Sequence, residues 1–112
     1  MNNLGSVNIW RVLIDAVDSE LLYLLNRRAE LAIEAGRAKQ NAGLPIRDSE
    51  RERDVIARVC QANAGPLDNA AVAKSFRRII RETRRTEMRF AQSEYARDPI
   101  EIEEMHQPGS AT

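Results

Sequence analysis

One long run of helical spacing constrains the fold more than any other feature of this sequence. From about residue 7 to about residue 41, apolar side chains recur at intervals of three and four residues, the pattern of one face of an amphipathic α-helix. The members of this row are Leu13, Ile14, Val17, Leu21, Leu24, Leu25, Leu31, Ala32 and Ala35. The row predicts a long helix that packs one face against apolar neighbours.

The length of this predicted helix has a consequence for assembly. A helix of about 35 residues is about 52 Å long, whereas a compact monomer of this size has a radius of gyration of about 13 Å. The helix must therefore extend beyond the core that its own chain of 112 residues can form. The simplest cover for the projecting part is a second copy, so the sequence predicts an obligate homodimer.

A second, shorter helix is predicted after a break in the first. Gly43 and Pro45 mark the break, because glycine commonly follows the last turn of a helix and proline cannot continue it. Asp48 or Ser49 then caps a helix that continues to about residue 63. Acidic residues in its first turn suit the positive end of the helix dipole.

A third helix is predicted from a cap at Asp68 or Asn69 to about residue 95 or 97. Its inward row is Val72, Phe76, Ile79, Ile80, Thr83, Glu87 and Phe90. No segment has the alternating pattern of a strand. The predicted fold is therefore all-α, with a long, a short and a long helix forming one domain over residues 1–97. We expect the first six residues to be frayed.

The overall composition excludes several classes of protein. Lys plus Arg and Asp plus Glu number 17 each, so no net charge favours nucleic acid or an anionic membrane. Cys60 is the only cysteine, which excludes an intrachain disulfide and fits a reducing compartment. The N-terminal residues do not resemble a signal peptide, and no apolar run approaches the ~20 residues of a membrane span. We therefore expect a cytoplasmic protein.

Ionisable and polar residues interrupt the inward faces of all three predicted helices. Arg28 and Lys39 both lie on the row of the first helix, about 20° apart around its axis and about 16 Å apart along it. Cations on a packed face are unfavourable unless anions meet them. The full inward set is Arg28, Lys39, Asp48, Arg51, Glu52, Thr83 and Glu87. Such residues cluster where a polar ligand is held.

Each of these residues alone has an ordinary structural interpretation. Arg28 alone would be an ion-pair arginine, Thr83 a core threonine bonded to its own helix, and residues 48–52 a capped helix start. Together they predict a site with more cations than anions, and therefore a small anionic ligand that also carries a hydroxyl or ether. The sequence has no nucleophile–base pair and no metal-ligand spacing, so any chemistry must work by positioning and charge stabilisation.

Four segments have a distinctive order and spacing. They are Leu13-Ile14-Asp15-x-x-Asp18, Leu24-Leu25-x-Arg27-Arg28-x-Glu30-Leu31-Ala32, Gly36-Arg37-Ala38-Lys39 and Pro45-Ile46-Arg47-Asp48-x-x-Arg51-Glu52. With their flanks they cover nearly all of residues 10–92, and they resemble the all-helical class of chorismate mutases. In that family two three-helix chains intertwine, and an arginine from the other subunit completes each active site. The resemblance implies the Claisen rearrangement of chorismate to prephenate, without cofactor or metal, in phenylalanine and tyrosine biosynthesis.

The resemblance also implies which residues bind the two carboxylates and the ether oxygen of chorismate. Arg28 would bind one carboxylate and Arg11 of the partner chain another, with Thr83 contacting a carboxylate. Arg11 lies about 100° around the helix from Arg28, so it is poorly placed to share that site within one chain. Lys39 would donate to the ether oxygen, where negative charge grows as the C–O bond breaks.

The start of the second helix would bind the ring hydroxyl of the substrate. By the same resemblance, Asp48 through its backbone and Glu52 would hold that hydroxyl. Arg51 would order this helix start.

Glu87 departs from the bacterial members of the family, many of which have glutamine there; fungal members resemble this chain in having glutamate. A carboxylate only accepts hydrogen bonds, so only the protonated acid can donate to the ether oxygen. Burial among Phe76, Ile80 and Phe90 favours the protonated acid, whereas Lys39 favours the carboxylate. We expect activity to fall as the pH rises and this acid loses its proton.

Two other functions remain open at this stage. Isochorismate-pyruvate lyases share the fold and resemble this chain in the first helix, but they do not keep the pattern of residues 47–52, which favours the mutase. A helical interaction or nucleic-acid-binding module is the second alternative. Its support is a run of arginines on the third helix, Arg77, Arg78, Arg81, Arg84, Arg85 and Arg89. Their positions away from the inward row predict a solvated face instead.

The segment over residues 98–112 is polar and has no helical periodicity. Domains of this type are fused to another enzyme of aromatic biosynthesis in many organisms, or dock onto one. The segment is therefore a candidate for such docking, although a disordered end is the preferred interpretation.

Overall fold

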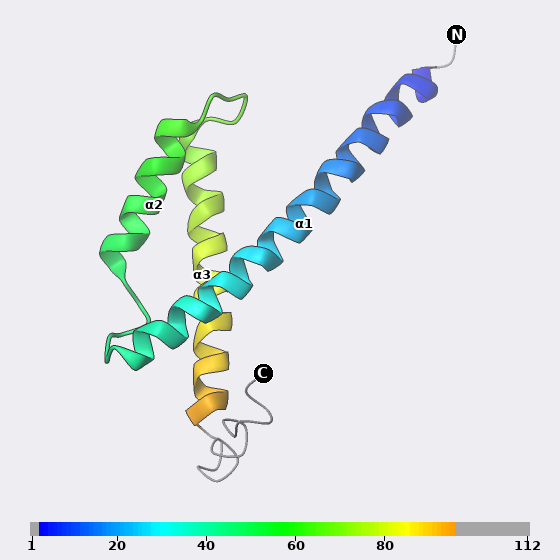
Figure 1. The fold of residues 1–112 in the computed structure, drawn as a ribbon. Helices are drawn as coiled ribbons and strands as arrows, with labels where there is room; N and C mark the ends of the chain where they lie inside the picture. Colours follow the sequence, from blue (N-terminus) through cyan, green and yellow to red (C-terminus); the bar gives the residue numbers. More distant parts are fainter. Residues whose placement is uncertain (1–2, 96–112) are drawn as a thin grey trace.

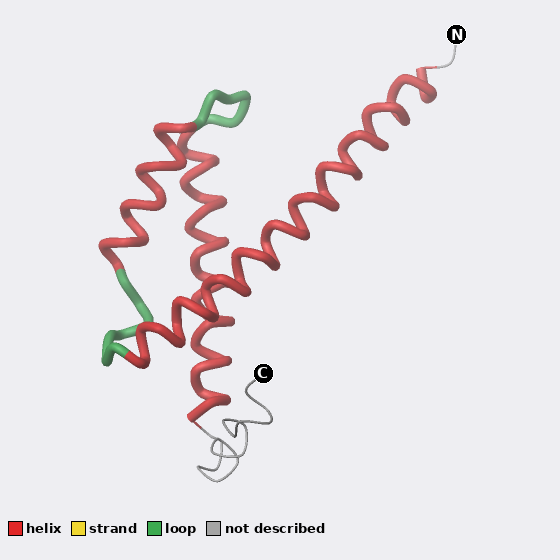
Figure 2. The backbone as a smooth tube through the Cα atoms, viewed as in Figure 1, coloured by secondary structure: helices red, strands yellow, loops and turns green. Residues whose placement is uncertain are grey.

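The computed structural model describes residues 3–95, which form three helices and the loops between them. The helices are α1 (Asn3–Asn41), α2 (Ser49–Ala62) and α3 (Asn69–Tyr95). Within the described residues every segment is helix or loop, as Figure 2 shows, so the predicted all-α fold is confirmed. The predicted tail over residues 98–112, and the alternative helix end at residue 97, lie outside this range.

The start of α1 differs from the prediction. The helix begins at Asn3, whereas the polar N-terminal residues were expected to be frayed up to residue 6. No proline interrupts this stretch, and Gly5 lowers helix stability by only about 1 kcal/mol relative to alanine. Extending an existing helix is far easier than nucleating one, so a few polar residues do not end it.

Local hydrogen bonds set the end of α1 and the starts of α2 and α3. The amide of Gly43 (φ +71°) donates to the Gln40 carbonyl at 3.1 Å, and the next amide donates to the Lys39 carbonyl at 2.8 Å, which closes α1 with a Schellman motif. Asp48 caps α2, accepting from the Arg51 amide at 3.0 Å. Asp68 caps α3, accepting from the amide of residue 71 at 2.8 Å. Both aspartates were among the predicted caps.

Of the three described helices, α3 is the one that contacts both others. In Figure 1, α2 lies beside the first half of α3, the C-terminal half of α1 crosses the middle of α3, and the N-terminal half of α1 stands away from both. The radius of gyration is 19.9 Å and the longest dimension is 70 Å. Both values exceed those of a compact chain of this length. The prediction that the first helix projects beyond its own core is therefore confirmed.

The core within one chain is small and lies along α3. Its buried apolar residues are Val72, Ala73, Ile80 and Ala91, and the polar residues Thr83 and Glu87 are buried in the same row. Phe90, which was predicted to face inward, is 42% exposed, and the neighbouring Ala91 takes the inward position instead. The polar residues therefore lie within the buried row, between Ile80 and Ala91.

The apolar row of α1 is exposed along its projecting half. Leu13, Ile14, Val17 and Leu21 are each more than half exposed, and the neighbouring Trp10 is 65% exposed. The described part of the chain supplies nothing to cover them. Even so, none of the described helices is long and apolar enough to cross a membrane.

Candidate active site

A cavity of about 280 Å³ lies where the three helices meet. Its lining includes seven of the eight predicted site residues, namely Arg28, Lys39, Asp48, Arg51, Glu52, Thr83 and Glu87. Arg11, the eighth, is exposed on the projecting half of α1 and does not line this cavity. The inward spacing along three separate helices therefore predicted one shared site.

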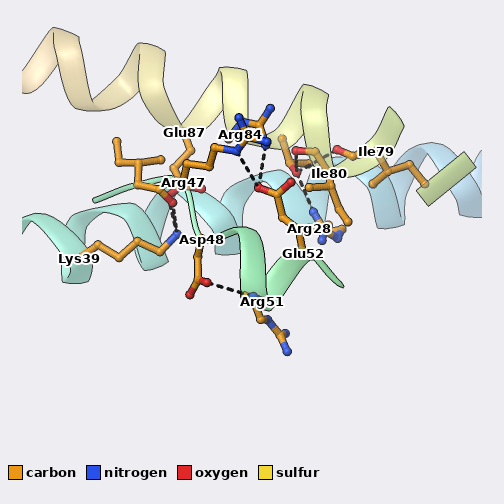
Figure 3. A network of polar contacts seen from close by, with 12 residues as sticks. Arg28, Lys39, Arg47, Asp48, Arg51, Glu52, Ile79, Ile80, Arg84 and Glu87 are labelled. Carbon is orange, nitrogen blue, oxygen red and sulfur yellow. Dashed lines mark hydrogen bonds and ion pairs between the residues drawn. The ribbon is translucent and has the colours of Figure 1, made fainter. Parts of the chain in front are cut away.

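Lys39 connects the three segments that surround this cavity. Its Nζ donates to the carbonyl of Ile46 in the loop before α2 at 2.8 Å, and to Oε2 of Glu87 on α3 at 3.0 Å (Figure 3). The Glu87 side chain is only 7% exposed. A buried carboxylate needs a cation or several donors, and Lys39 meets that need. The pair lies on the cavity wall, where a bound ligand can reach both groups.

Gly36 allows Glu87 to lie flat against α1. A Cβ atom built on Gly36 would be 2.6 Å from Cγ of Glu87 and 3.0 Å from its Oε2. Real Cβ atoms do not approach other atoms so closely, and Cγ is held near the α3 backbone, so it cannot easily move aside. The absence of a side chain at Gly36 therefore gives Glu87 its path to Lys39.

We expect Gly36→Ala to lower the free energy of unfolding by about 1 to 3 kcal/mol, because the added methyl group overfills the α1–α3 contact. The displaced Glu87 should also lose its contact with Lys39. Thermal unfolding checks the first effect. Gly5→Ala is the matched control, because nothing lies within 4 Å of the added atom. Equal stability of the two variants would contradict this role for Gly36.

Arg28 is oriented by a hydrogen bond across the α1–α3 interface. Its Nη1 donates to Oγ1 of Thr83 at 2.7 Å, and the same hydroxyl lies 2.9 Å and 3.1 Å from the carbonyls of Ile79 and Ile80, to which it donates. Burial, with the nearby positive charge of Arg51, holds the pKa of Arg28 below its ordinary value, while Glu87 acts in the opposite direction. Four cations and three carboxylates line the cavity, so its lining has an excess of positive charge, which favours an anionic ligand.

The start of α2 closes the other side of the cavity. The Asp48 side chain is engaged in capping the helix, and its carbonyl accepts from the Glu52 amide at 3.0 Å. Asp48 and Arg51 line the cavity, as their predicted inward positions require. Both residues are nevertheless exposed and not buried. Glu52 is half-buried, and its Oε2 lies 2.7 Å from Nη1 of Arg84 and 3.9 Å from Nε of Arg47.

Arg84 corrects one sequence-based assignment. It was placed on the solvated arginine face of the third helix, yet its side chain is only 22% exposed and lines the cavity. Residue 84 lies at the edge of the inward row, about 100° from Thr83, and the approach of α2 brings Glu52 over it. The other five arginines of that run are exposed, as predicted. The sequence placed Glu52 inward without assigning it a cationic partner. That was the signal that a cation should lie nearby.

Taken together, the fold and the cavity define a class of protein. Arginine and lysine side chains from all three helices line one small cavity together with the carboxylates of Glu52 and Glu87. Among residues 3–95, no three His, Cys, Asp or Glu side chains come close enough together to hold a metal ion. The class is an all-helical protein whose pocket suits a small, polar, multiply charged anion.

Comparisons with known proteins agree with this class. The family model described as chorismate mutase type II matches residues 10–88. The bifunctional chorismate mutase/prephenate dehydratase of Escherichia coli K12 is 41% identical over 71 residues, which cover 62% of this chain and 18% of that protein. Its counterpart in Aquifex aeolicus is 39% identical over 71 residues, covering 60% and 20%. The chain thus spans about a fifth of the length of these curated relatives.

A solved structure gives the same result at the level of the fold. Chorismate mutase (form II) from Thermus thermophilus superposes with a TM-score of 0.73 and 32% sequence identity, covering 75% of this chain and 96% of that one. The chain belongs to the chorismate mutase type II family. The resemblance seen in the sequence is therefore confirmed.

Proposed function

We propose that this chain is a chorismate mutase, which converts chorismate to prephenate in a single rearrangement. The observation that carries the proposal is the pair of Lys39 and Glu87 on the cavity wall, in the same cavity as Arg28. An ammonium group at that place is suited to an ether oxygen that gains negative charge. The cavity offers cations for a dianion and no nucleophile, which suits a reaction without a covalent intermediate.

In this proposal each group acts on a different part of chorismate. Arg28, oriented by Thr83, binds one carboxylate and fixes the substrate in the cavity. Lys39 donates to the ether oxygen and holds it more tightly in the transition state than in the ground state. Glu52 accepts from the ring hydroxyl, with Asp48 beside it at the helix start. Binding the flexible dianion in a folded geometry supplies much of the acceleration.

Two further arginines have supporting roles in the same proposal. Arg51 adds positive charge at the cavity mouth, and Arg84 orients the Glu52 carboxylate through their 2.7 Å contact. These are positioning roles, because each acts on a group that would touch the substrate. We propose a catalytic domain over residues 1–97, and the cytoplasm as its compartment, which suits a chain with one cysteine.

A second copy of the chain completes the site in this proposal. The exposed apolar row of α1 supports a homodimer, since burying a leucine or valine side chain contributes about 1.5 to 3 kcal/mol each. Arg11 lies on that projecting half, away from its own chain's cavity. In an intertwined dimer it would reach the partner's cavity and bind the second carboxylate.

The direct test is the loss of chorismate absorbance with purified protein and no added metal. We expect prephenate as the product. No turnover would contradict the proposal, and pyruvate release from isochorismate would then identify the lyase activity of the same fold instead.

We expect Glu87→Gln to keep or raise kcat/KM for chorismate, because an amide can donate a hydrogen bond to the ether oxygen whereas a carboxylate only accepts. The comparison is made at several pH values, which also tests the pH dependence expected from the sequence. The matched control is Glu82→Gln, on the same helix but paired with the surface residues Arg78 and Arg85, and it should leave kcat/KM unchanged. A large fall in kcat/KM for Glu87→Gln alone would show that the carboxylate itself is required beside Lys39.

A further inference from the structure

A second cavity, of about 520 Å³, lies between α2 and α3. Its charged lining is five arginines and one glutamate, namely Arg47, Arg53, Arg77, Arg81, Arg84 and Glu52. We call it the arginine cavity. On α2 it uses Ser49 and Arg53, whereas the candidate active site uses Arg51 and Val55, so the two cavities open on different faces of that helix.

The positive charge of the arginine cavity is only partly balanced by the protein. Its one carboxylate, on Glu52, is engaged by Arg84 and Arg47. Within residues 3–95, no ion pair or side-chain hydrogen bond engages Arg53, Arg77 or Arg81. Guanidinium groups cannot relieve their mutual repulsion by losing a proton. By contrast, Arg78 and Arg85 on the same helix are both paired with Glu82.

The chemistry of the lining indicates the class of ligand. Guanidinium groups bind carboxylate and phosphate oxygens through paired hydrogen bonds, and several of them together select a ligand with more than one negative charge. Ile56, Ala57 and Ile80 give the same cavity an apolar part. We propose that the arginine cavity binds a small organic anion with at least two negative charges, either a polycarboxylate or a phosphorylated compound.

The arginine cavity shares a wall with the candidate active site. Glu52, Ile80 and Arg84 line both cavities, and the 2.7 Å contact between Glu52 and Arg84 forms the polar part of that wall (Figure 3). An anion in the arginine cavity competes with Glu52 for the guanidinium of Arg84. Resting on the proposed function, this competition weakens the hold of Glu52 on the substrate hydroxyl. The bound anion therefore raises KM more than it lowers kcat.

Isothermal titration calorimetry at constant ionic strength tests the site itself. Citrate is the probe for a polycarboxylate ligand, and pyrophosphate is the probe for a phosphorylated one. We expect the double variant Arg53→Gln/Arg77→Gln to bind the preferred probe at least about tenfold more weakly. The matched control, Arg78→Gln/Arg85→Gln, removes two arginines that are exposed like Arg53 and Arg77 but lie outside the cavity, and it should bind as the unmodified protein does. Equal weakening in both variants would reveal only diffuse attraction and overturn the proposal.

The same titration separates the two cavities. Lys39→Gln removes a cation of the candidate active site alone, so it should leave probe binding unchanged. Loss of binding in that variant would place the anion in the active site and overturn the proposal, as would no binding of either probe to the unmodified protein. These readouts need no turnover, so they decide the anion site even if chorismate is not the substrate.

Chorismate kinetics test the coupling. At a saturating concentration of the preferred probe we expect KM to rise about five- to a hundredfold in the unmodified protein, and to stay constant in Arg53→Gln/Arg77→Gln. An equal rise in the variant would mean direct competition at the active site and overturn the coupling, as would no rise despite binding. Absence of turnover without probe would count against the proposed function instead.

Discussion

Replacing Lys39 by alanine is expected to lower kcat/KM for chorismate by about a hundred- to a thousandfold. The reason is that the Lys39 ammonium group is held on the cavity wall by two separate acceptors, the Ile46 carbonyl and the Glu87 carboxylate. A donor fixed in this way needs no reorganisation when charge develops on the ether oxygen. Removing a single preorganised donor of that kind typically costs about 2.7 to 4 kcal/mol of transition-state stabilisation. A drop of less than tenfold would exclude this role.

Two controls separate the catalytic effect of Lys39 from a structural one. Lys74→Ala removes the only other lysine, an exposed residue of α3, and should leave activity unchanged. Lys39→Ala also leaves the buried Glu87 carboxylate without its cation, so it should lower stability. Adding Glu87→Gln to Lys39→Ala removes that charge and should restore most of the stability, measured by thermal unfolding, without restoring activity. Recovery of activity together with stability would indicate that Lys39 is only structural.

How far the sequence predicted this site depends on what holds each residue in place. Lys39 and Glu87 were expected to be neighbours because both interrupt apolar rows, and a helix converts such a row directly into a face. The cap at Asp48 is equally local, since it needs only the next three residues. These features required no knowledge of how far apart the helices lie.

The features that were missed depend on the distances between helices. Arg84 is drawn into the cavity by Glu52 of α2, and its position on α3 alone placed it at the edge of the solvated face. The role of Gly36 depends on how closely α3 approaches α1, although its place in the motif before Lys39 was noticed. Phe90 was assigned inward by periodicity, but the smaller Ala91 is the buried residue at that level, and Phe90 lies at the edge of the contact with α1.

The apolar row of α1 presents a different problem. Its spacing correctly predicted a helix, yet the face that it forms is exposed within the described chain, because the neighbour it suits is not part of that chain. The periodicity indicates that this face packs against apolar neighbours, but it does not identify those neighbours. Arg11 lies on the same half of α1. Whether a second copy of the chain covers this half is therefore the same question as whether Arg11 acts on another chain.

Mixing two inactive variants is expected to answer it. Arg11→Ala and Arg28→Ala should each lose most of their activity, since removing one partner of a buried charge pair costs about 2 to 5 kcal/mol. In a mixed dimer, the Arg11→Ala chain still has Arg28 and receives Arg11 from its partner, so one of its two sites is intact. With random pairing about half of the dimers are mixed, and coexpression should restore about a quarter of the original activity.

The matched control for this experiment mixes Arg28→Ala with Lys39→Ala. Both residues line the cavity of their own chain, so every site in the mixed dimer lacks one of them and no activity should return. Recovery with Arg11→Ala and not with Lys39→Ala therefore requires that Arg11 acts on the other subunit. If coexpression of the Arg11 and Arg28 variants restores nothing although sedimentation shows mixed dimers, Arg11 does not complete the partner's cavity. The second carboxylate would then be bound by a cation of the same chain, with Arg51 and Arg84 the two that line the cavity beside Arg28 and Lys39.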